Sequence, residues 1–377
     1  MAGIYIHIPF CKQACSYCNF YFSTSLGQKD QLIQALLQEI KQPSTWMGSN
    51  HSIDTIYFGG GTPSLLNRDE LKDIMEAIHE RFEVADNVET TLEANPDDIQ
   101  LETVKAWMNI GINRLSLGVQ SFHEKELTWM NRAHSASVAK QSIDIIQAAG
   151  IKNISVDLIF GSPLIEDKTL LEHATYLIEK RIPHLSCYAL TIEPKTLLHH
   201  SIRKKQSPSV DSDQQARQFL LLSDRLQAAG YEHYEISNYA LPGMRSQHNS
   251  SYWKGKPYYG FGPSAHSFDG IQKRRWNIAN NAKYIQLVAG NQPFYEEEIL
   301  TPTQQVNECI LTQIRTIEGI DLSLMKKQFG ERWCTDLMEK SQPFFKAQTL
   351  INTADNRIVL TREGKLFADG MASELFF

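Results

Sequence analysis

Short apolar segments alternate with amphipathic segments along the first half of the chain. The apolar segments are rich in β-branched and aromatic residues, as buried strands are, and they cover residues 4–8, 55–58, 88–92, 114–119, 154–160 and 184–190. Helix-period patterns cover residues 31–40, 70–81, 137–149 and 168–180. Six strands that alternate with helices predict parallel β/α units. The pattern fits a closed or partial barrel and equally an open doubly wound sheet.

The second half of the chain has a different pattern. A helix pattern over residues 213–229 leads to a strand-like segment over 231–236. Residues 241–269 are rich in Gly, Pro, Ser and aromatics, which predicts a long ordered loop, and loops of that length are usually functional. From residue 301 onward, helices and a last apolar segment predict a small winged-helix-like domain. We therefore divide the chain into a core over residues 1–235, a loop and linker region over 236–300, and a C-terminal domain over 301–377.

Charge and hydropathy exclude several classes of protein. The 377 residues include 37 Lys and Arg against 43 Asp and Glu, which gives a net charge of -6. A general binder of nucleic acid or of anionic membranes needs a basic surplus or stripe, so we expect no nucleic-acid partner. No apolar run reaches the roughly 20 residues that span a bilayer, and the first apolar segment is interrupted by His7 and Pro9. We expect a cytoplasmic protein without membrane insertion.

Three of the six cysteines, Cys11, Cys15 and Cys18, form a CxxxCxxC motif directly after the first strand. The pattern does not predict a disulfide framework, which is typical of short, cysteine-dense secreted chains. A zinc site needs four ligands, so zinc would require a distant fourth ligand such as Cys187 or a histidine. An iron–sulfur cluster held by three cysteines leaves one iron free to bind a substrate or cofactor. Buried thiols without metal would pack poorly on such a polar loop.

Glycine and polar residues occur where the other strands end. A Gly-Gly-Gly-Thr-Pro segment over 59–63 follows the second strand, and glycines let the backbone approach a ligand closely. It is not a phosphate loop, because no Lys-Ser/Thr follows. Glu93, Gln120 and Asp157 break or end later strands, and Arg132 lies beyond one. Ligands of β/α folds bind at strand ends, although each of these residues alone is equally well explained as a capped turn or a surface pair.

The cysteine motif after an opening strand resembles the radical S-adenosylmethionine (SAM) superfamily. Together with GGGTP, Glu-x-Asn-Pro, Gly-Val-Gln-Ser and Asp-Leu-Ile-x-Gly, it makes the chain similar to the oxygen-independent coproporphyrinogen III oxidase family and its relatives. The resemblance implies a partial (β/α)6 barrel with a small, mostly helical winged-helix-like C-terminal domain. It implies a [4Fe-4S] cluster on Cys11, Cys15 and Cys18 whose open iron binds SAM. It further implies a set of SAM-binding residues: Tyr5, Gly60, Gly61, Thr62, Glu93, Gln120, Arg132 and Asp157.

Two departures separate this sequence from the oxidases of that family. The oxidases carry a further cysteine two residues after the third, where this chain has Phe20, and they have an N-terminal extension before the first strand. By contrast, residues 248–253 match the HNxxYW pattern of a haem-chaperone branch. The resemblance implies haem binding by His248, Asn249, Tyr252 and Trp253, with the His248 imidazole as axial ligand of the iron. A single histidine in a loop is more often a surface or hydrogen-bonded residue.

We therefore expect a haem chaperone that binds haem and passes it to haem-requiring apoproteins, with membrane-bound respiratory enzymes among the acceptors. The alternative is an oxidase that decarboxylates porphyrinogen propionates after hydrogen abstraction by a 5′-deoxyadenosyl radical. A third possibility is a radical enzyme with another substrate. No residue is assigned a catalytic role. The basic segment over residues 273–276 is interpreted as a solvated turn, with contact to porphyrin propionates as the alternative.

Overall fold

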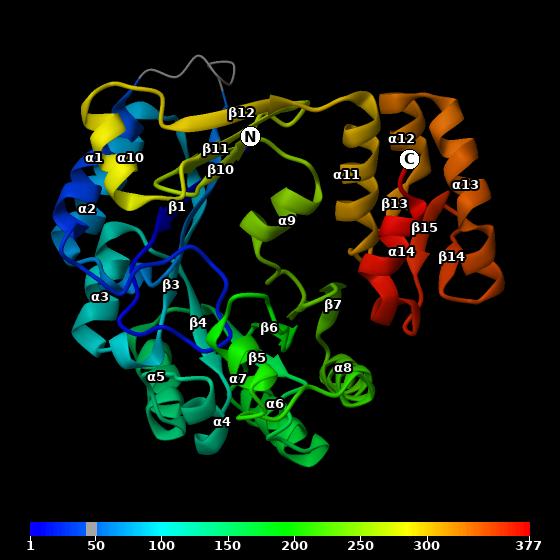
Figure 1. The fold of residues 1–377 in the computed structure, drawn as a ribbon, viewed down its shortest axis with the longest axis horizontal. Helices are drawn as coiled ribbons and strands as arrows, with labels where there is room; N and C mark the ends of the chain where they lie inside the picture. Colours follow the sequence, from blue (N-terminus) through cyan, green and yellow to red (C-terminus); the bar gives the residue numbers. More distant parts are fainter. Residues whose placement is uncertain (43–50) are drawn as a thin grey trace.

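Six parallel strands form the centre of the computed structural model, which describes residues 1–42 and 51–377. They pair in chain order, each with the next, and the sequence predicted all six. A doubly wound sheet would reverse its order part-way, so the uninterrupted order identifies a partial barrel (Figure 1). The strands are β1 (Ala2–Ile8), β2 (Ile53–Gly60), β3 (Val84–Ala94), β4 (Arg114–Gln120), β5 (Asn153–Phe160) and β6 (His184–Ala189).

Helices cover the outer face of these strands, and the four predicted ones are confirmed. Local signals define their ends: Asn67 and Glu70 form a capping box, and Gly111 and Gly150 end helices in the left-handed conformation. The helices are α1 (Lys29–Lys41), α2 (Arg68–Arg81), α3 (Leu101–Ile110), α4 (Glu124–Trp129), α5 (Ala136–Ala149) and α6 (Asp167–Glu179).

The two faces of the six strands differ in polarity. Alternate residues face opposite sides of a strand, and the outward set packs with the helices into the main core. Its buried members include Ile4, Ile6, Ile56, Phe58, Leu115, Leu117, Val156 and Leu158. The inward set is polar and lines the bore of the barrel: Tyr5, His7, Tyr57, Glu93, Arg114, Ser116, Ser155, Asp157, His184 and Ser186. A bore with so many hydrogen-bonding groups is suited to a polar ligand.

Residues 241–269 are not a long loop, and that prediction is wrong. They form a helix and two short strands, of which β9 pairs with β1 and extends the sheet. The glycines reflect close strand contact, since a Cβ on Gly260 would lie 1.9 Å from the carbonyl oxygen of His266. The elements of this region are α9 (Gln247–Trp253), β9 (Tyr258–Phe261), β10 (His266–Phe268), β11 (Lys273–Asn277), α10 (Asn281–Ala289) and β12 (Tyr295–Ile299).

The basic segment over 273–276 is not a solvated turn either, because it lies in β11. β11 pairs antiparallel with β12, which places acidic residues opposite the arginines. Arg275 pairs with Glu297 at 3.0 Å, and Arg274 pairs with Glu308 at 2.6 Å. These arginines are therefore engaged in ion pairs.

Two helices and two strands follow β6, and the strands complete the other edge of the sheet. The strands β7 and β8 pair with each other, and β8 continues the sheet antiparallel to β6. A short helix, α7, packs beside the carboxyl end of the barrel, and α8 packs on the outside against α6. The elements are α7 (Leu197–Arg203), α8 (Ser212–Ala228), β7 (Glu232–Glu235) and β8 (Asn238–Ala240).

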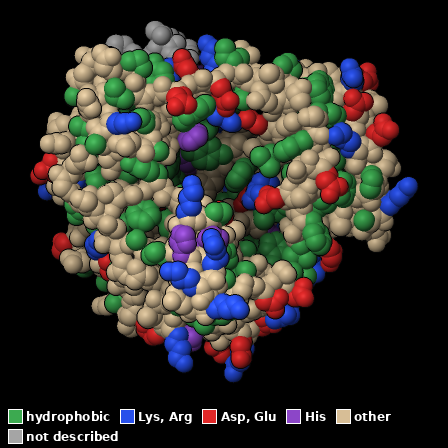
Figure 2. All heavy atoms as spheres, viewed as in Figure 1, with side chains coloured by type: hydrophobic (Ala, Val, Ile, Leu, Met, Phe, Trp, Pro, Cys, Tyr) green, Lys and Arg blue, Asp and Glu red, His purple; other side chains and the backbone are tan. Residues whose placement is uncertain are grey.

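In a space-filling view, the face drawn in Figure 2 is hollowed at its centre, between the barrel and the C-terminal residues. Four ion pairs connect the two parts: Arg315 with Glu235, Arg245 with Glu318, Arg274 with Glu308, and Arg362 with Asp224.

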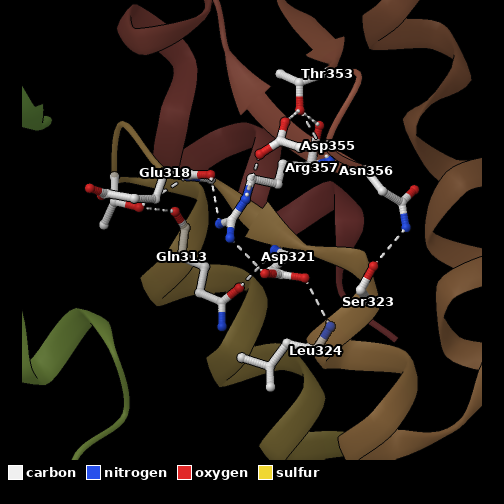
Figure 3. A network of polar contacts seen from close by, with 11 residues as sticks. Gln313, Glu318, Asp321, Ser323, Leu324, Thr353, Asp355, Asn356 and Arg357 are labelled. Atoms are coloured by element: carbon white, nitrogen blue, oxygen red, sulfur yellow. Dashed lines mark hydrogen bonds and ion pairs between the residues drawn. The ribbon is translucent and has the colours of Figure 1, made fainter.

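The C-terminal residues have a core of their own, formed by residues between Val306 and Leu375. Figure 3 shows how its small sheet is connected: Arg357 on β15 donates to the Asp321 carboxylate at 2.7 Å, and Asp321 caps the next helix through the Leu324 N–H. Across the described residues, no helix is both long and apolar enough to cross a membrane. The elements are α11 (Pro302–Ile314), β13 (Ile320–Asp321), α12 (Leu322–Phe329), α13 (Glu331–Lys346), β14 (Leu350–Asn352), β15 (Arg357–Leu360) and α14 (Ala368–Leu375).

Candidate cofactor site

The cysteine loop connects β1 to α1 and crosses the carboxyl end of the barrel. Hydrogen bonds fix its backbone to the residues that follow α4: the Ser16 N–H donates to the Met130 carbonyl at 3.0 Å, and the Asn131 amide donates to the Ala14 carbonyl at 2.7 Å. The Gln13 amide donates in return to Asn131 Oδ1 at 2.7 Å. These hydrogen bonds fix the path of the loop across the end of the barrel.

All six cysteines are free thiols, and the three in the loop are half-buried. Burial raises the pKa of the Cys11 thiol to about 11 and raises the pKa of Cys18 as well. Metal binding removes the thiol proton. Among the described residues, no group of three His, Cys, Asp or Glu side chains converges on one ion. Cys187, the proposed distant zinc ligand, is buried in the main core.

A cavity of about 410 Å³ opens beside the three cysteines. Residues from the ends of β2, β3, β4 and β5 line it. The sequence predicted a ligand site at these strand ends. Of the residues that the sequence assigned to SAM, those that line the cavity are Gly60, Gly61, Thr62, Glu93, Gln120, Arg132 and Asp157. Tyr5 is not among them, because its side chain lies deeper in the bore, where its hydroxyl is 3.1 Å from His7 Nδ1. The structure thus brings all but one of these residues to the cysteines.

The glycine segment packs directly against the cysteine loop. A Cβ on Gly61 would lie 2.5 Å from the Phe10 carbonyl oxygen, so no larger residue fits there. Gly60 has φ +109°, a conformation that favours glycine. The next residue, Thr62, donates its N–H to Phe10 at 2.6 Å and accepts a side-chain hydrogen bond from Asn95 at 3.1 Å. The glycines therefore permit the close crossing that forms one wall of the cavity.

Two buried carboxyl groups give the cavity an affinity for cations. Burial raises the pKa of Glu93 to about 7 and that of Asp157 to about 6. Their side-chain hydrogen-bond donors include neutral hydroxyls: Tyr57 donates to Glu93 at 2.8 Å, and Ser116 lies 3.5 Å from Asp157. The Arg114 guanidinium lowers the pKa of both carboxyl groups, but burial outweighs it. A ligand with a positive charge would stabilise both carboxylates. SAM carries a sulfonium and an ammonium group, so these residues fit it.

Arg132 connects the cysteine loop to the cavity wall. Its guanidinium donates to the Cys15 sulfur at 3.2 Å and to Asn95 and the Gly118 carbonyl at 2.6 Å each. Its buried Nε has no partner among the described residues, and unpaired buried donors are rare in folded proteins. A carboxylate ligand in the cavity would satisfy it. Gln120 ends β4 with φ +67°, a strained backbone that is common at ligand sites.

His248 does not lie at the cavity. It lies in the half of the bore nearer the amino ends of the strands, called the lower bore, whereas the cavity at their carboxyl ends is the upper bore; the two names follow the strand direction and not the view in Figure 1. His248 is 2% exposed, and both of its ring nitrogens have partners at 2.8 Å: Nδ1 with the Thr55 hydroxyl and Nε2 with the Tyr252 hydroxyl. Burial lowers its pKa to about 3. The ring stacks on Tyr57 with a centroid distance of 5.0 Å. In this conformation His248 has no free nitrogen for a metal.

The other residues assigned to haem surround His248 on α9. Ser246 caps the helix, because its hydroxyl accepts a hydrogen bond from the Asn249 N–H at 3.3 Å. Tyr252 meets Tyr258 edge to face at 4.7 Å. The buried indole nitrogen of Trp253 has no partner among the described residues, and the Arg315 guanidinium lies 5.6 Å from its ring. The side chains of this motif therefore hold α9 in place between the barrel and the C-terminal residues.

The sequence reasoning missed several lining residues, among them Tyr17, Asn95 and Ser116. Ser116 could have been found, because it precedes Gly118 and Gln120 by two and four residues and so shares their inward face. Tyr17 lies within the cysteine motif and has no sequence signal of its own. Asn95 could have been found, because it is the asparagine of the Glu-x-Asn-Pro segment that ends β3.

Comparison with known proteins supports this arrangement of strands. The family described as "Radical SAM superfamily" matches residues 5–177, and that described as "HemN C-terminal domain" matches residues 300–367. The solved structure of coproporphyrinogen III oxidase (HemN) from Escherichia coli superposes with a TM-score of 0.84 at 21% identity, covering 100% of this chain and 90% of that one. At this identity the likeness shows the fold.

Full-length relatives define the family more closely. The chain is 35% identical to heme chaperone HemW of Escherichia coli, over 99% of this chain and 97% of that protein. It is 33% identical to heme chaperone HemW of Bacillus subtilis, over 98% and 97%. It is also 32% identical to heme chaperone HemW of Mycobacterium tuberculosis, over 99% and 94%. The chain therefore belongs to the heme chaperone HemW family of the radical SAM superfamily.

Proposed function

We propose that this chain is a cytoplasmic haem chaperone, which binds haem and passes it to haem-requiring apoproteins. The observation that carries the proposal is the similarity over nearly the full chain to proteins named heme chaperone HemW. Six free thiols are consistent with a reducing compartment. Membrane-bound respiratory enzymes are the acceptor class that we propose.

The cavity holds a [4Fe-4S] cluster and SAM in this proposal. Cys11, Cys15 and Cys18 would hold the cluster, which would leave one iron open to SAM. When bound, the cluster supplies one-electron chemistry. Arg132 pairs with a carboxylate through its unpaired Nε, and Glu93 and Asp157 stabilise the cationic groups. Gly60, Gly61, Thr62 and Gln120 shape the walls.

Phe20 supports the chaperone over the oxidase. It occupies the position where the resembled oxidases have a fourth cysteine, and it lines the mouth of the cavity with 70% of its surface exposed. A large exposed apolar side chain is suited to contact with a ligand or partner.

His248 remains our proposed axial ligand for stably bound haem, with Asn249, Tyr252 and Trp253 beside it. Because both of its ring nitrogens are hydrogen-bonded in the buried bore, ligation requires α9 to move out of the barrel. The Thr55 and Tyr252 hydroxyls would then lose a buried partner, so the haem-bound form has a different arrangement of this helix.

Two assays on anaerobically reconstituted protein test the proposal. Haem titration followed by the Soret band should show stoichiometric binding. Incubation with coproporphyrinogen III, SAM and a reductant should form no protoporphyrinogen. Turnover in the second assay would assign the chain to the oxidases, and an absence of haem binding in the first would reject the chaperone.

A further inference from the structure

α7 and the residues around it carry a run of basic and imidazole side chains. Between Lys195 and Lys205 the sequence has four Lys and Arg, two His, and no Asp or Glu. All four cations are exposed, and none forms an ion pair with another described residue. In Figure 2, Lys, Arg and His side chains gather below the central hollow, in the part of the molecule where Figure 1 places α7. In a chain of net charge -6, this segment is a local site for anions.

The inner face of α7 is part of the wall of the cofactor site. The Leu198 N–H donates to the carbonyl of Ser16, between the second and third cysteines, at 2.7 Å. The Leu198 side chain packs in a buried cluster with Met130, Ile159 and Leu190. Ile159 and Leu190 also line the cavity. The helix is therefore held at the rim of the cavity, and its position follows that of the cysteine loop.

Leu197, His200 and Lys204 share the outer face of α7, because they are spaced three and four residues apart. The side chains of His200 and Lys204 form no hydrogen bond or ion pair with another described residue, and Leu197 is 59% exposed. The His199 ring lies 5.6 Å from that of His200, and its buried Nδ1 has no hydrogen-bond partner among the described residues. Apolar, imidazole and cationic groups thus occur together on one face of α7. Phe20 is a further exposed apolar side chain, at the mouth of the cavity that the inner face of this helix borders.

We propose that this rim, made of α7 and Phe20, is the surface on which haem first docks. His200 binds the iron, Phe20 and Leu197 contact the macrocycle, and Lys204 and Lys205 pair with the propionates. The inference rests on the proposed haem binding and adds the location of the entry site. An open rim lets an acceptor protein reach the haem, whereas the buried His248 does not.

An acidic protein is the other ligand that this charge could attract. Such a partner would use the cations, but it would not explain an exposed leucine, an exposed phenylalanine and two imidazoles on the same rim. The combination matches a planar apolar ring with an iron centre and two carboxylates, so the observations favour haem.

Stopped-flow mixing of haem with the full-length chain, followed by the Soret band, tests this inference. We expect His200→Ala to lower the association rate constant by more than about tenfold and to remove an early Soret intermediate, because the first axial ligand is lost, while the final spectrum stays that of wild type. Lys204→Glu with Lys205→Glu should lower the rate constant by about threefold to tenfold, and less for haem dimethyl ester, in which the propionates are uncharged. The matched controls are His79→Ala on the exposed side of α2 and Lys326→Glu with Lys327→Glu on α12, which should leave the rate constant unchanged.

The outcomes separate this inference from the proposed function. If the wild-type chain binds no haem, the proposed function fails. If the wild-type chain binds haem and the α7 variants bind it at the same rate through the same Soret intermediate, the docking surface is wrong while the proposed function stands. An unchanged rate of haem binding combined with slower cluster reduction by an acidic electron-transfer protein would assign the rim to that partner and overturn the inference. His199→Ala checks whether the neighbouring imidazole substitutes for His200.

Discussion

The upper and lower halves of the barrel bore both contain buried polar side chains, but these side chains differ in whether they have protein partners. In the upper half, Glu93, Asp157 and Arg132 line an open cavity, and the Nε of Arg132 has no partner among the described residues. In the lower half, His248 and His184 each have both ring nitrogens hydrogen-bonded. Their partners are Thr55 and Tyr252 for the first, and Ser155 and Tyr234 for the second.

Burial alone does not distinguish these two regions, since buried polar groups occupy both. The difference lies in whether each donor and acceptor has a protein partner, because a buried group without one costs free energy until a ligand supplies it. The upper bore is therefore a binding site. The lower bore is, in this conformation, a structural network.

The largest effect should follow from changing the cysteine loop. Cys15→Ser should abolish binding of the [4Fe-4S] cluster, because three thiolates are the minimum set here. The fold should persist, since hydrogen bonds of the loop with Met130 and Asn131 fix its path. Iron and acid-labile sulfide in anaerobically reconstituted protein measure the loss. Cys334→Ser, a half-buried thiol in the C-terminal residues, is the matched control. A cluster content equal to wild type in Cys15→Ser would refute the assignment of the upper bore.

The second effect concerns the stability of the lower bore. His248→Ala should lower the free energy of unfolding by about 2–4 kcal/mol, because it leaves a cavity and two unpaired hydroxyls, those of Thr55 and Tyr252. Urea unfolding followed by circular dichroism measures it. His200→Ala, an exposed histidine, should change stability by less than about 0.5 kcal/mol. Equal stability of the two variants would show that the lower bore is not a structural network.

A milder change sharpens that comparison. Tyr252→Phe removes one of the two partners of His248 and keeps the packing of the ring, so it should cost about 1 kcal/mol. The same variant leaves His248 Nε2 without its hydrogen-bond partner. If His248 is the axial ligand, Tyr252→Phe should therefore bind haem at least as tightly as the wild-type chain.

The fold of the core could be predicted because each strand and helix has a local signal. β1 to β6 combine apolar outward residues with terminal glycines or polar residues, and α2, α3 and α5 have caps that the sequence displays. The strands β9 to β12 could not be predicted, since they are three to five residues long. Their pairing depends on neighbours that are distant in the sequence, such as β1 for β9.

The cofactor residues were predictable for a related reason. A residue at the carboxyl end of a parallel strand lies at the same end of the barrel as its counterparts, so Glu93, Gln120 and Asp157 meet without further information. The environment of His248 was not predictable, because its partner Thr55 is 193 residues away in the sequence. A motif specifies the types of residue. It does not specify whether their nitrogens are already paired.

The smallest effect concerns the charge of the upper bore. Glu93 and Asp157 have pKa values raised by burial to about 7 and about 6, so the ligand-free fold binds more protons than the unfolded chain between about pH 4 and pH 7. Its stability should therefore fall as pH rises through this range. A bound cation reverses the preference, so SAM affinity should rise with pH, by up to about tenfold per unit for each carboxyl group that must ionise.

S-adenosylhomocysteine isolates this effect, because it lacks the sulfonium and keeps the amino and carboxylate groups. We expect the ratio of the two dissociation constants, measured by calorimetry on cluster-loaded protein, to favour SAM increasingly from about pH 5 to pH 7. Asp157→Asn should flatten this dependence and reduce the preference for SAM by about tenfold, equivalent to about 1.4 kcal/mol. It should also stabilise the ligand-free fold near neutral pH, because no carboxylate is left buried at that position. A variant with the wild-type ratio at every pH would mean that Asp157 does not face the sulfonium, and the cationic preference of the upper bore would then depend on Glu93 alone.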